Sequence, residues 1–184
     1  MCSSGSSLST PILGGKGLGT VEIKGEAKHN TRDLFCLSFS ATKLSNKEGW
    51  FATSDPFLNV SRINEDNTWT AVWKSSVIDN SLNPKWAAVK IPMSSLCNGD
   101  LDRPLKIEIL DFNKNGKHAS MGVVETSVRG LLTSGGAGLD VVEPEKKLKK
   151  KGYTNSGTLS AANCMIEYHP TFTEFIAGGC QVCL

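Results

Sequence analysis

The sequence predicts an all-β protein, a β-sandwich of many short strands, and three observations lead to that prediction. Apolar residues recur at every second position in several short runs, which is the period of a half-buried strand. Clusters of Asn, Asp, Gly and Pro separate these runs, as turns separate strands. Only the segment SVRGLLTS has the character of a short helix. Many short strands joined by turns are typical of a sandwich, which presents its loops at the ends of a rigid scaffold.

Each strand expectation has its own pattern in the chain. In LFCLSFSA the apolar residues share one face, namely Phe35, Leu37, Phe39 and Ala41. In PLKIEIL one face is apolar and the other is charged, with Leu105, Ile107 and Ile109 opposite Lys106 and Glu108. The other strand candidates are, in chain order, DPFLNVSRI, TWTAVWKSSVI, WAAVKIPM, SMGVVETSV and GTLSAANCMIEY. The turn clusters between the strands are NEDN, DNSLNP, CNGDLDRP and NKNGKH.

Composition narrows the class of protein. The 184 residues suit about one domain, and a net charge of +2 gives no nucleic-acid signature, so no nucleic-acid partner is expected. The first residues, MCSSGSSLSTPILGG, lack the basic and apolar regions of a secretory signal, and no apolar run is long enough to span a bilayer. With six scattered cysteines, these features indicate a reduced, cytoplasmic protein.

Motifs of catalysis are lacking, so the protein is not expected to be an enzyme. The sequence has no His-Glu-x-x-His, no nucleophile elbow and no paired carboxylate motif. The terminal CQVC would need two more ligands to hold zinc. GGKGLGT lacks the Gly-Lys-Ser/Thr ending of a phosphate loop, so it indicates a linker.

The segment DFNKNG, from Asp111 to Gly116, places oxygen-bearing residues directly after a strand. It matches the opening of an EF-hand calcium loop, but the twelfth position is Gly122 where that loop needs a bidentate Glu. Two interpretations remain on these residues alone. The segment is either an Asx-rich hairpin turn or part of a different cation site.

Several junctions between strands and loops together resemble a known family. SDPFL, NSLNPKW and IEILDFNKNGKHASMG resemble, in this order, the C2 domain, an eight-stranded sandwich that binds calcium and lipid through loops at one end. RDLFCLSFSATKLSNKEGWFATSDPFL, SLCNGDLDRPLKIEILDFNKNGKH, EKKLKKKGYTNSGTL and PTFTEFIAGG resemble the second C2 domain of a copine. The resemblance extends from about Thr20 to the end of the chain.

The copine resemblance implies a division of the chain, since copines carry two C2 domains followed by a von Willebrand factor A-type domain. Residues 1–30 are expected to be a Ser/Gly-rich leader and a strand resembling the end of a preceding C2 domain. Residues 31–169 are expected to be the C2 domain. Residues 170–184 resemble the linker and the start of a truncated A-type domain.

The resemblance also implies a depleted calcium site. Asp55 and Asp111 match two of the five acidic ligand positions of the family. Glu48 is the candidate for a third, one residue further from Asp55 than the family spacing, with a longer side chain that would compensate. Asn113 keeps an oxygen but loses the charge, and Ala119 offers no ligand. At most three formal negative charges remain, so the expectation is one weakly held calcium ion or none.

Two further sets of residues are candidates for membrane contact. The family resemblance places Trp50 and Phe51 at the tip of the first binding loop, where Trp suits the membrane interface. The alternative is packing of these aromatics against a neighbouring loop or a partner protein. The basic candidates are Lys114, Lys117, His118, Lys146, Lys147, Lys149, Lys150 and Lys151. A solvated, aggregation-resistant surface is the alternative for the lysine run.

The function expected from the sequence is that of a copine-like C2 domain. It would target anionic phospholipid, at the cytoplasmic side of the plasma membrane, with a weakened dependence on calcium. Protein partners would be reached through flanking domains. The competing hypothesis is a calcium-independent module that binds proteins.

Overall fold

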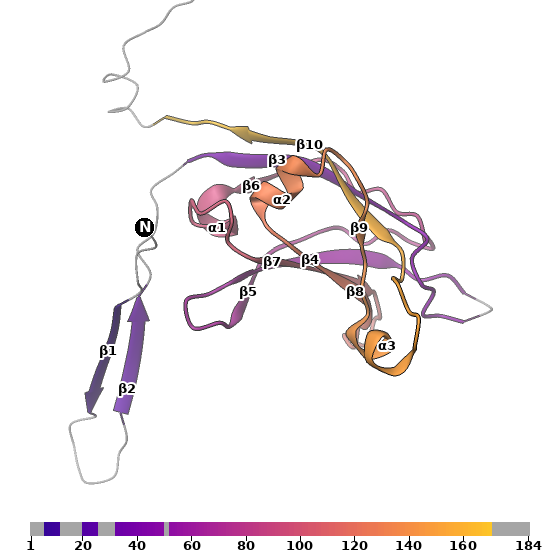
Figure 1. Cartoon of the computed structure of the whole chain (residues 1–184), viewed down its shortest axis with the longest axis horizontal. Helices are drawn as coiled ribbons and strands as arrows, with labels where there is room; N and C mark the ends of the chain where they lie inside the picture. Colours follow the sequence, from indigo (N-terminus) through magenta and orange to yellow (C-terminus); the bar gives the residue numbers. More distant parts are fainter. Residues whose placement is uncertain (1–5, 12–19, 26–31, 50–51, 171–184) are drawn as a thin grey trace, which may run out of the picture.

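The computed structural model describes residues 6–11, 20–25, 32–49 and 52–170 (Figure 1). Two four-stranded sheets form a sandwich, one in the order β6-β3-β10-β9 and the other in the order β5-β4-β7-β8. Every pair of neighbouring strands is antiparallel. The predicted eight-stranded antiparallel sandwich is therefore confirmed.

The strands of the first sheet are β3 (Leu34–Thr42), β6 (Val89–Pro92), β9 (Leu139–Asp140) and β10 (Thr158–Glu167). Those of the second sheet are β4 (Pro56–Ile63), β5 (Trp69–Lys74), β7 (Leu105–Asp111) and β8 (Ala119–Thr126). Three short helices are α1 (Met93–Leu96), α2 (Val128–Thr133) and α3 (Pro144–Lys149). In the part of the chain that the structure describes, no helix has the length and apolarity to cross a bilayer.

The alternating runs seen in the sequence build the core between the two sheets. In β3 the even-numbered side chains face outward, whereas Phe35, Leu37 and Phe39 are at most 3% exposed. In β7 the core side chains Leu105, Ile107 and Ile109 are fully buried. Such a core contributes about 25 cal/mol for each Å² of apolar surface removed from water. It provides a rigid frame for the loops that leave β3, β4 and β7.

Strand β10 contains a bulge that adds one residue to its pairing with β3. Ala162 lies opposite Ser38, but the next pair is Met165 with Cys36, so two residues of β10 face one residue of β3. Asn163, within the bulge, has a φ of 54°. Beyond the bulge Ile166 packs against the core. A bulge bends its strand and re-aims the side chains that follow it.

A separate two-stranded sheet lies near the N-terminus, formed by β1 (Ser6–Pro11) and β2 (Thr20–Gly25). The first of these segments was expected to be part of a Ser/Gly-rich leader without strands. The Ser-rich β1 shows little alternation of apolar residues, so only its pairing with β2 reveals it as a strand. The three proposed domain ranges stay predictions, and residues 171–184 of the last one lie outside the described residues.

Candidate functional site

The pairing of β4 with β7 brings Asp55 and Asp111 together at one end of the sandwich. Pro56 lies opposite Asp111, and the backbone N–H of Asp55 donates to Oδ1 of Asp111 at 2.7 Å. The Asp55 carboxylate in turn accepts a hydrogen bond from the backbone N–H of Asn80, also at 2.7 Å. The β5–β6 connection therefore helps to hold the carboxylate of Asp55. Sequence reasoning placed both aspartates at strand ends, and the structure places them side by side.

Glu48 extends this pair to three carboxyl groups. The pKa of Glu48 is raised, first because its protonated form donates a hydrogen bond to Asp111, and further because Asp111 and Asp55 are negatively charged nearby. Asp111 is 1% exposed, and its Oδ2 atom accepts no hydrogen bond from protein donors. A buried carboxylate oxygen needs a donor or a cation, and the neighbouring Glu48 carboxyl supplies a donor when it is protonated.

Asn46 and Ser54 shape the first loop, which carries Glu48. The amide nitrogen of Asn46 donates to the carbonyls of Gly49 and Ala52, and its Oδ1 accepts from the N–H and hydroxyl of Ser54. These hydrogen bonds tie the start of the loop, at Asn46, to its end, at Ala52 and Ser54. The candidate membrane residues Trp50 and Phe51 lie outside the described residues.

The third loop uses Asn113 to close its own turn. The amide nitrogen of Asn113 donates to the carbonyl of Lys117 at 3.0 Å, and Ala119 pairs with Asp111 in the ladder. Neither residue adds charge to the carboxyl cluster. Across residues 6–11, 20–25, 32–49 and 52–170, no three His, Cys, Asp or Glu side chains have the arrangement of a ready-made metal site.

The basic residues of the third loop differ in their surroundings. Lys114 and Lys117 are exposed, as the membrane hypothesis requires. The ring of His118 instead stacks on Phe112, with centroids 5.2 Å apart, and meets the edge of Phe57 at 4.9 Å. Its Nδ1 accepts from the N–H of Asn113. The packing of His118 therefore supports the loop.

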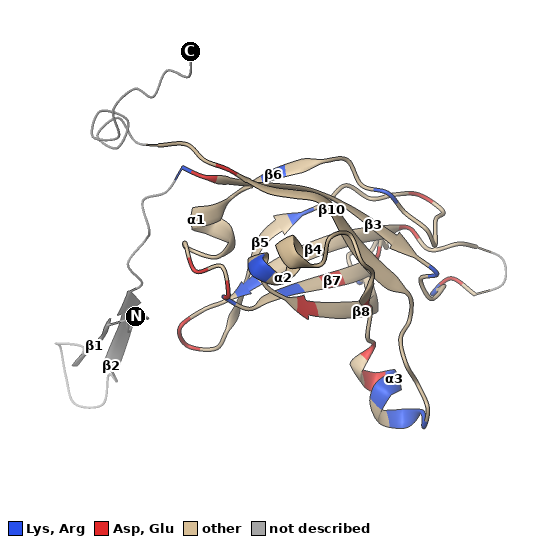
Figure 2. Ribbon diagram, turned by 45° about the horizontal axis from the view of Figure 1, so that its top comes forward, with Lys and Arg blue, Asp and Glu red and all other residues tan. Residues whose placement is uncertain are grey.

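The lysine run forms a helix, where sequence reasoning had considered a strand edge or a loop. Lys146, Lys147 and Lys149 belong to α3, and Lys150 and Lys151 follow it (Figure 2). Lys149 makes an exposed ion pair with Glu145 at 3.4 Å. Between the lysines, Leu148 is 87% exposed.

A buried carboxylate, Glu143, connects α3 to the first loop. It is 8% exposed and accepts from Lys47 at 2.5 Å, from Lys146 at 2.7 Å and from the Ser156 hydroxyl at 2.6 Å. Burial alone would raise the pKa of Glu143, but the hydrogen bonds from Lys146, Lys47 and Ser156 outweigh it and lower the pKa. Sequence reasoning missed Glu143 because Lys47 lies 96 residues away along the chain.

Comparison with known proteins identifies the family to which this chain belongs. The model of the C2 domain matches residues 32–141, which is more than half of the chain. The chain belongs to the C2 domain family. C2 domains are generally non-catalytic modules that bind membrane lipids or proteins.

Two solved C2 domains are similar to this one. BON1-C2B has 31% sequence identity and a TM-score of 0.62, with 74% of this chain and 93% of that chain covered. The C2A domain of a plant Extended Synaptotagmin 1 has 14% identity and a TM-score of 0.52, with 79% and 100% covered. The second comparison supports the fold alone.

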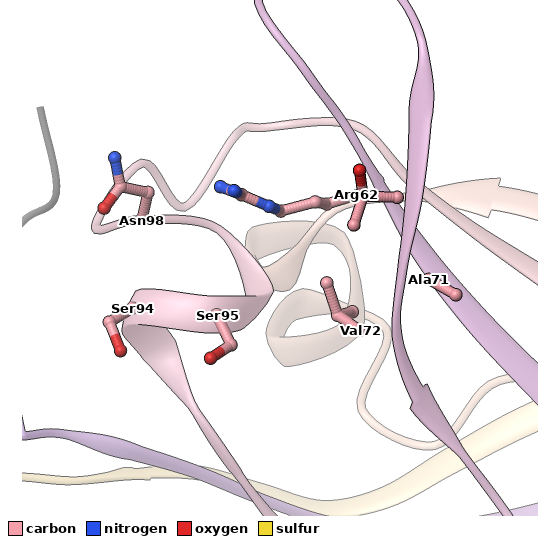
Figure 3. Close-up of a pocket in the computed structure, with 7 residues that line it drawn as sticks. Arg62, Ala71, Val72, Ser94, Ser95 and Asn98 are labelled. Carbon is pink, nitrogen blue, oxygen red and sulfur yellow. The ribbon is translucent and has the colours of Figure 1, made fainter. Parts of the chain in front are cut away.

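Among the pockets on the described surface of this C2 domain, two lie beside the elements discussed above. One, of about 460 Å³, lies between α1 and the β4–β5 pair, where Arg62 extends toward Asn98 (Figure 3). The other, of about 700 Å³, is lined by Lys47, Ser120, Val123, Glu143, Pro144, Glu145, Lys146, Lys149 and Lys150. The second pocket thus joins the first loop, β8 and the lysine helix into one surface.

Proposed function

We propose that this C2 domain is a copine-like, peripheral membrane-binding module in which calcium contributes weakly. The observation that carries the proposal is the cluster of Glu48, Asp55 and Asp111 at a loop end of the sandwich, flanked by exposed lysines. The similarity to BON1-C2B, a copine-family protein, supports the copine assignment over most of that domain's length. The domain is proposed to act without catalysis and without a nucleic-acid partner.

The carboxyl cluster offers oxygen ligands for one calcium ion, but fewer than calcium prefers. Asp111 Oδ2 lacks a donor, and the adjacent Glu48 offers a second oxygen. Calcium prefers six to eight oxygen ligands, and its affinity rises with the number of carboxylates. The amide nitrogen of Asn113 donates to the carbonyl of Lys117 within the turn, and the side chain of Ala119 has no oxygen to offer. Water would have to complete the coordination, so the affinity is expected to be low.

Lysines supply the attraction that a weak calcium site cannot. Lys114 and Lys117 extend from the third loop, and Lys147, Lys150 and Lys151 are exposed around α3. Each lysine near an anionic leaflet contributes about 1 kcal/mol. The inner leaflet of the plasma membrane is the anionic surface that we propose the domain meets from the cytoplasm. Trp50 and Phe51 are proposed to insert from the tip of the first loop into the headgroup region of the bilayer.

Co-sedimentation with phosphatidylserine vesicles tests the proposed function. We expect the protein to bind in the presence of a chelator and to bind modestly better with calcium. Neutral phosphatidylcholine vesicles are the control, because they remove the charge attraction and keep the bilayer. Failure to bind anionic vesicles in both conditions would favour the alternative, a module that binds proteins without calcium.

Restoring acidic residues should strengthen calcium binding. Asn113→Asp combined with Ala119→Asp places charge at two ligand positions, and we expect calcium affinity to rise by on the order of tenfold or more. Isothermal titration calorimetry measures the change. Asn115→Asp is the matched control, since it adds charge to the same turn and should gain less. An equal gain from both would show that loop charge, not coordination, sets the affinity.

Protons should compete with calcium at Glu48. Because the pKa of Glu48 is raised by Asp111 and Asp55, its carboxyl holds a proton at higher pH than an ordinary glutamate does. Calcium competes with that proton, so calcium affinity is expected to fall as the pH is lowered toward the raised pKa of Glu48. Calcium titrations at neutral pH and at successively lower pH values measure the effect. Glu48→Gln should abolish most of the pH dependence, and a dependence that survives would exclude Glu48 as the competing group.

A further inference from the structure

We propose that the pocket between the first loop, β8 and α3 is a second lipid site, which binds the headgroup of a phosphoinositide carrying more than one phosphate. This inference rests on the proposed membrane function and adds a specific ligand class and location to it. Its residues are Lys47, Ser120, Lys146, Lys149 and Lys150, with Leu148 beside them.

The charge of the pocket favours an anion. Four lysines and two glutamates line it, which leaves two positive charges in excess. Glu143 is already saturated by Lys47, Lys146 and Ser156, so it presents little free negative charge to a ligand. The pair of Lys149 and Glu145 is long and solvent-exposed, and such pairs are weak enough for an arriving phosphate to replace.

The same network orients the cations before a ligand arrives. Glu143 holds the ammonium groups of Lys47 and Lys146 at hydrogen-bond distance, so these two side chains have already lost much of their rotamer freedom. Lys150 makes no ion pair with any residue in the described ranges, and Ser120 can donate from its exposed hydroxyl. Donors that are positioned in advance bind with a smaller entropic cost.

The size of the pocket indicates a ligand larger than one phosphate. Its volume of about 700 Å³ lies within the range of sites for drug-sized molecules. A single phosphate would occupy a small part of it and meet one or two lysines. A ring that carries several phosphates would reach Lys47 on the first loop and Lys150 beyond α3 at the same time, with charge-assisted hydrogen bonds to each.

Leu148 indicates that this ligand belongs to a membrane. The side chain is 87% exposed and lies between Lys147 and Lys149 on α3. An apolar side chain surrounded by lysines suits the boundary between headgroups and acyl chains. Because Lys47 donates to Glu143, the residue directly before α3, this helix is tied to the first loop, which also carries Glu48 of the carboxyl cluster.

Two measurements on the full chain separate headgroup recognition from general charge attraction. Calorimetry with soluble inositol 1,4,5-trisphosphate, without calcium, reports binding to the pocket alone. Sedimentation compares vesicles containing phosphatidylinositol bisphosphate with phosphatidylserine vesicles of equal total charge. We expect saturable binding of the trisphosphate and about tenfold preference for the bisphosphate vesicles. If the trisphosphate does not bind, or the two vesicles bind equally, the proposal is overturned even where phosphatidylserine binding upholds the membrane function.

Matched lysine variants locate the site. Lys149→Gln with Lys150→Gln removes two charges from the pocket, whereas Lys147→Gln with Lys151→Gln removes two charges from outside its lining. The pocket variant should bind the trisphosphate about tenfold more weakly, and the control variant should change by less than about twofold. Equal losses in both variants would replace the pocket with a diffuse basic surface.

Leu148→Ser distinguishes the lipid from the soluble headgroup. We expect vesicle binding to weaken about fivefold, because burial of the leucine side chain is lost. Trisphosphate binding should stay within about twofold of the unmodified protein, since Leu148 does not line the pocket. Vesicle binding that does not change would overturn the insertion of α3, and the site would then serve a soluble polyphosphate.

Discussion

Gly157→Ala should destabilise this C2 domain by about 3 kcal/mol or more, as expected when a side chain is forced against backbone in a disfavoured conformation. Gly157 has a φ of +118°, and a Cβ atom there would lie 2.8 Å from the carbonyl oxygens of Thr42 and Lys43. The Cα of Leu44 would be 3.0 Å away. These neighbours are backbone atoms of the segment that ends β3, so they cannot rotate aside. Urea unfolding followed by tryptophan fluorescence measures the loss.

Gly152→Ala is the matched control for this prediction. Gly152 also has a positive φ, of +79°, but a Cβ atom there would meet nothing within 4 Å. Its substitution should cost about 1 kcal/mol, the conformational cost alone. If both variants lose the same stability, the close approach of Gly157 to the end of β3 is not the cause.

Glu143→Gln should lower the free energy of unfolding by about 2 kcal/mol at pH 7. The substitution removes the charge that balances Lys47, whose side chain is only 19% exposed. A buried cation without its partner is costly, although the half-exposed Lys146 can turn to water and limit the loss. Urea unfolding at pH 7 measures the difference. Glu145→Gln is the control, since that exposed carboxylate should contribute less than about 0.5 kcal/mol.

The pH dependence of the same pair of proteins identifies the cause. Hydrogen bonds lower the pKa of Glu143 in the folded state, so its ionised form stabilises folding above the pKa of the unfolded chain. That stabilisation is lost as the pH falls through the lowered, folded-state value. The gap between the unmodified protein and Glu143→Gln should therefore shrink between pH 5 and pH 3. A gap of constant size would mean that the amide disturbs packing and not charge.

The sandwich was predictable because its main strands carry a strict period of two. In β3 and β7 every second residue is buried, so the face of each strand is visible in the sequence. The helices α1 and α3, of four and six residues, are too short to show a helical period. Strand β9 has two residues and leaves no pattern at all.

The candidate site was predictable only where its residues lie at strand ends. Asp55 and Asp111 flank paired strands, so their proximity follows from the antiparallel ladder. The contact between Lys47 and Glu143 joins distant segments, and each residue alone has the sequence context of a solvated charge. The packing of His118 against Phe112 and Phe57 also left no signal in the sequence, where its neighbours are basic.

The bulge in β10 shifts by one residue the alternation of inward-facing and outward-facing side chains along that strand. Counting in twos from the buried Leu159 would place Glu167 in the core and Ile166 in water. The extra residue shifts the count, so that Ile166 packs inward and Glu167 meets Lys90 at 2.6 Å on the outer face. At the present length of the strand, its second half faces correctly only because the bulge takes up one residue. An insertion or deletion elsewhere in β10 would drive a carboxylate inward, whereas a residue lost from the bulge itself would leave both halves facing as they do now.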